Sequence, residues 1–283
     1  MEIIQRILPM KEASKKARSD GKVIGLVPTM GSLHEGHLAL VREARKMSDV
    51  VVVSIFVNPA QFAPNEDFEK YPRDATRDAE LLSAENVDFL FMPKIEEMYT
   101  SNFRTYVKVR DLSDRLCGVS RPNHFEGVTT VVMKLFQIVD PHFAFFGQKD
   151  AQQLIIVMRM VRDMNMDVEI VRVPIVRESD GLAMSSRNVY LSPEERKAAT
   201  VLYRALDHAL NRIEEGERKT KTLMKEMKEI ISSEPLAKID YIAITDLLML
   251  HDVKNVKGKC LIAVAAYFGA TRLIDNVIVE TEN

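Results

Sequence analysis

Two histidines three residues apart, His34 and His37, stand in the segment of this chain best suited to chemistry. They close the sequence Pro-Thr-Met-Gly-Ser-Leu-His-Glu-Gly-His at residues 28–37, which follows an apolar run at residues 23–27 and precedes a helical pattern at residues 38–44. A turn between a strand and a helix presents free backbone N–H groups and the positive end of the helix dipole. The segment therefore predicts a phosphate site, with attack on a nucleotide phosphate as its reaction.

Two other interpretations of this histidine pair stay open. One is an ordinary pair of surface histidines, and the other is a pair of zinc ligands. A zinc site needs a third or fourth ligand, and neither Cys117 nor Cys260 has a Cys or His partner at finger-like spacing. We therefore favour a phosphate site over a zinc site.

Five further motifs follow the histidine segment along the chain. They are Val-Asn-Pro-Ala-Gln-Phe at residues 57–62, Tyr-Pro-Arg at 71–73, Arg-Pro-Asn-His-Phe-Glu-Gly-Val at 121–128, Phe-Gly-Gln-Lys-Asp-Ala-Gln-Gln at 146–153 and Met-Ser-Ser-Arg-Asn at 184–188. The His-x-Gly-His core resembles the signature of the nucleotidyltransferase superfamily. The longer segment and its companions, in this order, resemble the pantothenate synthetase (pantoate–β-alanine ligase) family, over residues 23–191 and more loosely to the C-terminus.

This resemblance implies an AMP-forming ligase. In that family ATP and D-pantoate form pantoyl adenylate and pyrophosphate, and β-alanine then attacks the mixed anhydride to give pantothenate and AMP. ATP is thus expected as a substrate, together with Mg²⁺, which masks phosphate charge and is usually held by few protein ligands. Asp78 and Asp74 are candidate ligands for the metal, between which the sequence does not decide.

The resemblance also assigns roles to individual residues. His37 is the favoured donor to the reacting phosphate, as a proton donor or a stabiliser of charge, and His34 and Lys149 complete the catalytic set. Taken alone, Lys149 and Asp150 also fit an ordinary turn, in which the carboxylate caps the next helix. The residues expected to contact ATP are Met30, Gly31, Ser32, Leu33, His34, Glu35, Gly36, His37, Gly147, Gln148, Lys149, Asp150, Val176, Met184, Ser185, Ser186 and Arg187.

A second set is expected to bind pantoate and β-alanine. Amide side chains can bind hydroxyls and a carboxylate without adding charge of either sign. In the alternative interpretation Gln61 is a surface-loop residue and Gln153 an exposed helix position. The residues of this second set are Gln61, Gln153, Met30, Asn58 and Arg121.

Composition narrows the class of protein. The chain has 283 residues, 46% of them hydrophobic, and a net charge of −2, which argues against broad electrostatic binding to nucleic acid or membrane. No stretch approaches the roughly 20 apolar residues of a membrane helix, and the N-terminus lacks the pattern of a secretory signal. Two cysteines far apart in sequence favour the cytoplasm. The family resemblance implies a homodimer.

Apolar runs alternate with helical patterns through the first two-thirds of the chain. Strands are predicted near residues 23–27, 50–57, 88–92, 143–147 and 168–173, and helices near 73–85, 127–139 and 151–164. A continuous β-branched run such as residues 50–53 is typical of a strand covered on both faces. We therefore expect an α/β fold, with a Rossmann-like doubly wound parallel sheet in a nucleotide-binding domain at residues 1–176.

The pattern changes after residue 191. Ser192 and Pro193 form a strong helix start. Helices are predicted at residues 193–215 and 220–232, and strands at 239–245, 260–268 and 271–279. This predicts a smaller C-terminal α+β domain at residues 177–283. We expect this domain and the polar segment 63–71 to close over the site, since an acyl adenylate must be kept from water.

Three rival functions remain at this point. An adenylyltransferase that makes a dinucleotide would share the His-x-Gly-His site but lack the paired glutamines and the Pro-Thr-Met prefix. A tRNA synthetase would need an RNA-binding appendage and a basic face. A nucleotide sensor with a degenerate site would not be expected to retain His34, His37, Lys149 and Arg187.

Overall fold

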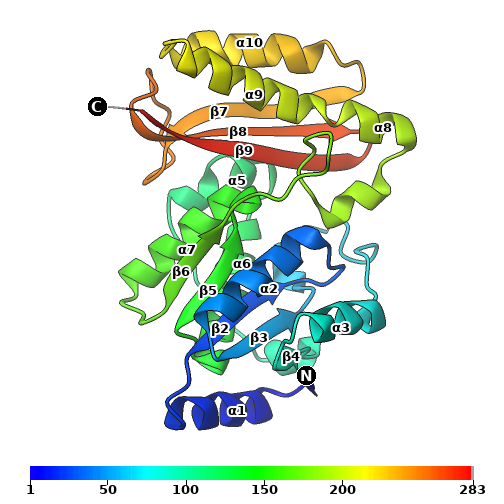
Figure 1. Cartoon of the computed structure of the whole chain (residues 1–283), viewed down its shortest axis with the longest axis vertical. Helices are drawn as coiled ribbons and strands as arrows, with labels where there is room; N and C mark the ends of the chain where they lie inside the picture. Colours follow the sequence, from blue (N-terminus) through cyan, green and yellow to red (C-terminus); the bar gives the residue numbers. More distant parts are fainter. Residues whose placement is uncertain (65, 282–283) are drawn as a thin grey trace. The chain divides into compact units, whose positions relative to one another are not determined.

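The computed structural model describes residues 1–64 and 66–281 and divides into two compact units (Figure 1). Unit 1 comprises Met1–Ser113, Arg121–Gln148 and Ile156–Pro174. Unit 2 comprises Asp114–Ser120, Lys149–Ile155 and the chain from Ile175 onward. Asn65, inside the predicted lid segment 63–71, lies outside the described residues.

Unit 1 is built on a six-stranded parallel sheet in the order β1-β4-β3-β2-β5-β6, which confirms the predicted doubly wound architecture. Its strands are β1 (Glu2–Ile4), β2 (Ile24–Thr29), β3 (Val50–Ile55), β4 (Phe89–Phe91), β5 (Phe143–Gly147) and β6 (Glu169–Val173). From β2 the chain proceeds to β3 and β4 on one side, and β5 and β6 lie on the other. The order therefore reverses between β2 and β5, where ligands bind in sheets of this kind.

Helices cover this sheet, and a core of aliphatic and aromatic residues fills the space between them. They are α1 (Ile7–Ser19), α2 (Glu35–Met47), α3 (Ala75–Ala84), α4 (Ile95–Met98), α6 (His124–Val139) and α7 (Ala151–Asp163), with short 3-10 helices η1 (Pro59–Gln61), η2 (Leu112–Asp114) and η3 (Gln148–Asp150). Helix α2 packs against β2 and β5 (Figure 1). Sequence patterning did not identify β1 and α1, because β1 is short and only Ile4 in it is buried.

Unit 2 carries an antiparallel sheet with two long helices on one face (Figure 1). Its elements are α5 (Cys117–Ser120), the 3-10 helix η4 (Ser186–Tyr190), α8 (Pro193–Ala198), α9 (Val201–Glu214), α10 (Thr220–Ser232), β7 (Ala237–Asp246), β8 (Gly258–Phe268) and β9 (Thr271–Thr281). An apolar core joins the helices to the sheet. The predicted α+β character is therefore confirmed.

The prediction of one helix over residues 193–215 was wrong, because α8 and α9 are separate. The Thr200 hydroxyl donates to the Lys197 carbonyl oxygen at 2.8 Å, and a side-chain bond of this kind competes with the helical ladder. The capping box at Ser192 and Glu195 that starts α8 was predicted in part, from the Ser-Pro pair.

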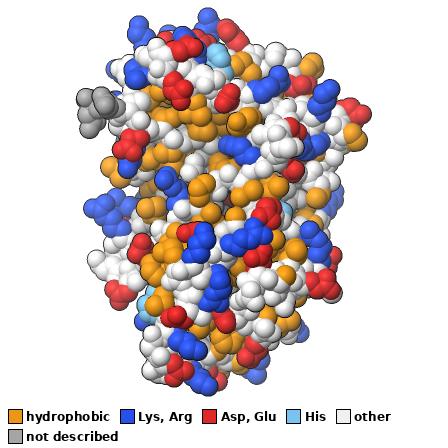
Figure 2. Space-filling view, viewed as in Figure 1, with side chains coloured by type: hydrophobic (Ala, Val, Ile, Leu, Met, Phe, Trp, Pro, Cys, Tyr) orange, Lys and Arg blue, Asp and Glu red, His pale blue; other side chains and the backbone are white. Residues whose placement is uncertain are grey.

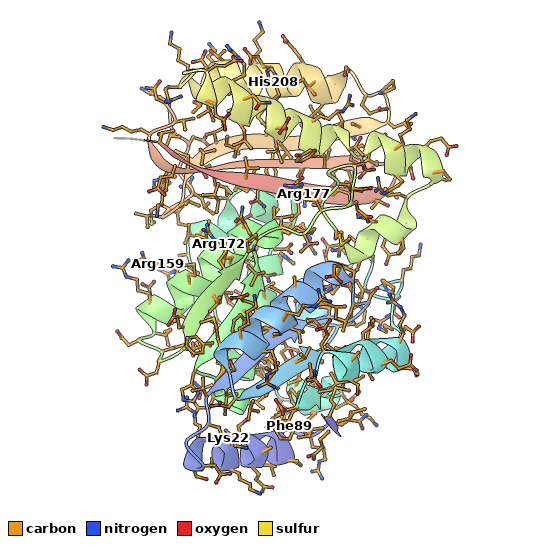
Figure 3. The ribbon with its side chains drawn as sticks, in the orientation of Figure 1. Lys22, Phe89, Arg159, Arg172, Arg177 and His208 are labelled. Atoms are coloured by element: carbon orange, nitrogen blue, oxygen red, sulfur yellow. The ribbon has the colours of Figure 1, made fainter. Side chains whose placement is uncertain are left out.

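Lys, Arg, Asp and Glu side chains cover the outer surface of the α9–α10 pair, as Figure 2 shows. His208 of α9, labelled in Figure 3, pairs across this surface with Glu226 of α10 at 2.9 Å. Among the described residues no helix combines the length and the apolar character that a membrane crossing needs.

Candidate active site

Asp78 of α3 holds the turn after β2 through hydrogen bonds to its backbone. Its two carboxylate oxygens accept the backbone N–H groups of Ser32 and Leu33, each at 2.8 Å, and the side chain is 1% exposed. Gly31 (φ +83°) and Ser32 (φ +51°) take left-handed conformations, in the turn that brings the Ser32 and Leu33 amides to this carboxylate. A Cβ on Gly31 would lie 3.0 Å from Asp78 Oδ2, so the close approach favours glycine.

The histidines complete the same turn. His34 is the N-cap of α2, and its Nδ1 accepts the Gly36 N–H at 3.1 Å, while His37 Nδ1 accepts the His34 N–H at 3.3 Å. The two rings lie with centroids 4.1 Å apart. A ring nitrogen that accepts an N–H carries no hydrogen, so each neutral imidazole carries its proton on Nε2. Both side chains are therefore arranged as donors through Nε2.

Five of the turn amides that we expected to bind phosphate donate to side chains of the protein. The N–H of Gly31 donates to Thr29 Oγ1 at 3.1 Å, and the amides of Ser32, Leu33, His34 and Gly36 donate to the side chains already described. Backbone polar groups at a buried turn need partners. Here side chains of the protein supply partners for these five amides.

Other predicted ATP contacts in this segment differ in their surroundings. Leu33 is 1% exposed and belongs to the core of unit 1, so its side chain serves packing. Glu35 forms an ion pair with Arg42, which also pairs with Glu85. The Met30 sulfur lies beside the side-chain amide of Gln61.

The two candidate Mg²⁺ ligands are both engaged with backbone amides. Asp78 holds the turn, and Asp74 caps α3 by accepting the Arg77 N–H at 3.0 Å. In the part of the chain that the structure describes, no group of three or more His, Cys, Asp or Glu side chains is arranged to hold a metal ion.

Gln61 is oriented by its neighbours. Asn58 Nδ2 donates to Gln61 Oε1 at 3.0 Å, and Gln61 Nε2 points at the Met30 sulfur at 3.2 Å. The Asn58 amide is itself fixed, because Nδ2 also donates to the Gly127 carbonyl oxygen at 3.0 Å and Oδ1 accepts the Tyr99 hydroxyl at 2.8 Å. Gln61 is therefore held as an N–H donor directed toward Met30.

Asn58 is 1% exposed and both ends of its amide are occupied within the protein. Its position therefore suits the orientation of Gln61 rather than contact with a substrate. Tyr99 was not singled out from the sequence. No local sequence pattern could link Tyr99 to Asn58, because the two residues are 41 positions apart along the chain.

Gly127 allows η1 to approach α6. A Cβ at this position would lie 2.2 Å from the Ala60 carbonyl oxygen and 2.6 Å from the Gln61 amide nitrogen. The sequence contained a usable signal for this residue, since Gly127 belongs to the motif at residues 121–128.

Arg121 is paired within unit 1. Its guanidinium donates to both Glu66 oxygens, at 2.5 and 2.7 Å, and contacts His124 Nε2 at 3.0 Å. Burial opposes ionisation of Glu66, but the Arg121 hydrogen bonds and charge prevail and lower the pKa of that carboxyl. His124 Nδ1 lies 2.8 Å from the Gln61 carbonyl oxygen, so the pair supports the backbone beside Gln61.

Lys149 follows the end of β5 in η3, with Gly147 ending the strand and Gln148 beginning the turn. Its ammonium group lies 3.8 Å from Asp150 Oδ1, and its side chain is 21% exposed. Gln153 lies in the first turn of α7.

A short hairpin carries the remaining predicted ATP contacts. Met184 N–H donates to the Val176 carbonyl oxygen at 3.0 Å, and Arg177 bridges to Ala183. After the hairpin, Ser185 begins η4 by accepting the Arg187 N–H at 3.2 Å. Ser186 beside it is buried.

The structure thus brings the predicted residues together in two groups. In unit 1 the imidazole turn, Met30, Gln61 and Asn58 form one connected cluster. Lys149, Asp150, Gln153 and the hairpin with its Ser-Ser-Arg loop belong to unit 2.

Comparison with known proteins gives one consistent result. Residues 2–278 match the family model described as Pantoate-beta-alanine ligase. Pantothenate synthetase from Caldicellulosiruptor bescii is 55% identical over 282 residues, which cover 100% of both chains. Pantothenate synthetase from Thermus thermophilus has a crystal structure that matches with a TM-score of 0.93 at 45% identity, covering 98% of this chain and 99% of that one.

A further solved structure is pantoate-beta-alanine ligase from Francisella tularensis, complexed with beta-gamma ATP and beta-alanine. It matches with a TM-score of 0.80 at 33% identity and covers 98% of this chain and 97% of that one. Because sequence and fold agree along nearly the whole length, this chain belongs to the pantoate–β-alanine ligase family of enzymes.

Proposed function

We propose that this protein condenses D-pantoate with β-alanine at the expense of ATP, through a pantoyl adenylate, and releases AMP and pyrophosphate. The observation that carries the proposal is the imidazole turn. His34 and His37 present Nε2 donors at the carboxyl end of β2, next to the point where the strand order reverses. The Francisella relative, whose structure contains beta-gamma ATP and beta-alanine, supports both substrates.

The reaction needs charge compensation first. A carboxylate oxygen of pantoate attacks the α-phosphorus of ATP, the bond to the bridging oxygen breaks, and pyrophosphate leaves with the electron pair. Nucleophile and polyphosphate repel each other, so fixed donors that meet the developing charge lower the barrier. We assign this work to His37 and His34 through Nε2 and to the ammonium group of Lys149.

In the second step the amine of β-alanine attacks the acyl carbon of the mixed anhydride. The amide bond forms, the acyl–phosphate bond breaks, AMP leaves and the amine loses a proton. We assign the nucleotide contacts to the remaining predicted set, with the hydroxyls of Ser185 and Ser186 and the guanidinium of Arg187 at the phosphates. Arg suits this role because its planar fork can make bidentate contacts.

Pantoate binding follows from the orientation of Gln61. An amide held as an N–H donor can bind a hydroxyl or carboxylate oxygen, and the Met30 side chain beside it offers an apolar surface for the gem-dimethyl group. Gln153 provides the second amide, and Arg121 supports the Gln61 backbone. Asn58 contributes to pantoate binding indirectly, because its amide orients the Gln61 side chain.

Three further properties belong to the same proposal. Mg²⁺ enters with ATP and masks phosphate charge. The protein forms a homodimer, which sedimentation velocity tests directly. Its location is the cytoplasm, a setting in which the two free cysteines Cys117 and Cys260 stay reduced.

Product analysis tests the reaction class. The protein is incubated with ATP, Mg²⁺, D-pantoate and β-alanine, and the nucleotides are separated by chromatography. We expect AMP only when pantoate is present, together with pantothenate. ADP as the product would overturn the adenylate mechanism. Dinucleotide formation, or no turnover with bound ATP, would favour the adenylyltransferase or the sensor.

Replacement of Lys149 by Ala tests the role assigned to its ammonium group in compensating the charge of the phosphates. We expect adenylate formation in a single turnover to fall by about two orders of magnitude or more, because one fixed donor at a developing charge contributes about 3–4 kcal/mol. Lys225→Ala is the matched control, since this lysine is exposed on α10 and pairs only with Glu229 among the contacts of its ammonium group that the structure describes. Wild-type adenylation in Lys149→Ala would remove Lys149 from the mechanism.

A further inference from the structure

Two consecutive polar residues of the edge strand β9, Asp275 and Asn276, are each 3% exposed. Neighbouring side chains on a strand point to opposite faces of the sheet. Asp275 shares its face with Leu273 and Val279, which pack in the core beneath the helices, and Asn276 belongs to the other face. Buried polar side chains are retained where they bond to something specific.

Asn276 bonds to the segment that carries the proposed catalytic lysine. Its Nδ2 donates to the carbonyl oxygen of Lys149 at 3.0 Å, across 127 residues of sequence. This bond fixes the backbone from which the Lys149 side chain extends. The next turn is anchored as well, because Gln152 Oε1 accepts the Cys117 N–H at 3.0 Å and its Nε2 donates to the Arg115 carbonyl oxygen at 2.7 Å.

Asp275 bonds to the hairpin that carries the Ser-Ser-Arg loop. Arg177 donates to its two oxygens at 2.6 and 3.0 Å, and the same guanidinium donates to the Gly181 carbonyl oxygen at 3.0 Å. Arg177 lies beside β9 in Figure 3 and stacks on the Tyr203 ring at 4.8 Å. Gly181 (φ +90°) has no room for a side chain, since a Cβ would lie 2.1 Å from that ring.

The two residues are also joined to each other. Asp275 Oδ1 accepts the Asn276 N–H at 2.7 Å, and Arg177 reaches the Asn276 carbonyl oxygen at 3.5 Å. A displacement of Asn276 would therefore also displace Arg177, and a displacement of the hairpin would also displace the Lys149 backbone. Burial raises the pKa of Asp275, while the Arg177 ion pair and the charge of Lys149 act in the opposite direction.

We propose that Asp275 and Asn276 are positioning residues that set the Lys149 segment and the hairpin at residues 176–184 in one fixed relation. This inference rests on the proposed function, because it gives Lys149 and the Ser-Ser-Arg loop their roles at the polyphosphate. The pair contacts no reacting atom and acts through the backbone of Lys149 and the guanidinium of Arg177.

The experiment is a double-mutant cycle on single-turnover adenylate formation, with Asn276→Leu, Lys149→Ala and the combination. Leucine keeps the branching at Cγ and the number of side-chain heavy atoms of Asn276 and removes the donor. We expect Asn276→Leu to slow adenylation about 10- to 100-fold, as for other small misplacements of a catalytic group. In the Lys149→Ala background the same change should have less than about a threefold effect, because coupled residues are non-additive.

Thr281→Val is the matched control. It removes another side-chain bond to backbone on the same strand, from Thr281 Oγ1 to the Val256 carbonyl oxygen at 3.4 Å, and should leave the rate unchanged. Thermal unfolding of every variant separates loss of fold from loss of position. If Asn276→Leu does not fold, Asn276→Ser, which is shorter and polar, takes its place in the cycle.

Three results distinguish the hypotheses. A wild-type rate in the Asn276 variant, or an equal loss in both backgrounds, would overturn the positioning role. Absence of pantoate-dependent AMP from the wild-type protein would instead refute the proposed function. For Asp275→Asn, which keeps the shape and weakens the Arg177 pair, we expect a KM for ATP raised several-fold, and an unchanged KM would contradict the link to the hairpin.

Discussion

At the scale of single residues, the histidine turn depends on a carboxylate far away in sequence. Asp78 accepts two backbone N–H groups of the turn from 45 and 46 residues away. Asp78 thereby accepts hydrogen bonds from two N–H groups that we expected to donate to a phosphate. In the proposed function, this turn presents the Nε2 atoms of both imidazoles as donors, because both Nδ1 atoms accept backbone N–H groups.

Asp78→Asn tests this arrangement. The new amide group keeps one acceptor and places an NH₂ against a backbone N–H, so we expect a loss of about 1–3 kcal/mol in the free energy of unfolding. Adenylate formation should fall as well, because the imidazoles shift with the turn. Urea denaturation and single-turnover kinetics measure the two effects. Asp74→Asn is the control, since Asn is as good an N-cap for α3, and unchanged behaviour of Asp78→Asn would contradict the role.

His37 has a structural part in addition to its proposed chemical part. Its Nδ1 accepts the His34 N–H, so the imidazole helps to hold the turn. His37→Ala should therefore lower the free energy of unfolding by about 0.5–2 kcal/mol and slow adenylation. His37→Gln restores an acceptor of the kind found in capping boxes. Recovery of stability without recovery of rate is the expected result, and equal recovery of both would count against a catalytic imidazole.

At the scale of elements, the proposed pantoate part of the site depends on a contact between η1 and α6. Asn58 Nδ2 bonds to the Gly127 carbonyl oxygen, and the missing side chain of Gly127 lets the Ala60–Gln61 backbone approach the helix. The orientation of Gln61 therefore depends on the packing of two elements and not on the loop alone.

Gly127→Ala should separate these elements. Overpacking of this kind costs about 1–3 kcal/mol, so we expect lower stability and a raised KM for pantoate with a smaller change in the KM for ATP. Steady-state kinetics with each substrate varied makes the comparison. Gln137→Ala, exposed on the same helix, is the control. Equal changes in both KM values would indicate a general loss of structure.

At the scale of the whole molecule, stability should depend on pH. Burial acts against the charged forms of Glu66 and Asp246, but hydrogen bonds from Arg121 and from three backbone N–H groups prevail and lower the pKa of each carboxyl. Burial and the charge of Arg18 lower the pKa of His142. In all three the folded state binds fewer protons than the unfolded chain. Their contribution is present above the ordinary pKa and is lost as the pH falls through the lowered one.

We therefore expect the urea midpoint to fall between about pH 7 and pH 3, in the range where histidine and then carboxyl groups titrate. The raised pKa of Asp275 acts in the opposite sense, as a single group against these three. Glu66→Gln should show a shallower decline than the wild-type protein. A midpoint that stays constant or rises on acidification would contradict the expectation.

The sequence by itself determined the class of fold and the position of the candidate site along the chain. Apolar runs that ended at turns predicted five of the six parallel strands, and the motif at residues 28–37 placed the histidines directly after β2. These signals are local, because strand periodicity, helix starts and short motifs each depend on residues that are close together in the sequence. The two charged helices and the small sheet at the C-terminal end followed from the same kind of pattern.

Only the tertiary structure decided how the site residues are held. Residues distant along the chain supply the partners: Asp78 accepts from the turn amides, Tyr99 donates to Asn58, which orients Gln61, and Asn276 donates to the Lys149 carbonyl oxygen. No local pattern encodes such pairs, since each depends on which elements the fold brings side by side and on which polar groups burial forces to find a partner. The site is therefore located by the sequence and oriented by long-range contacts.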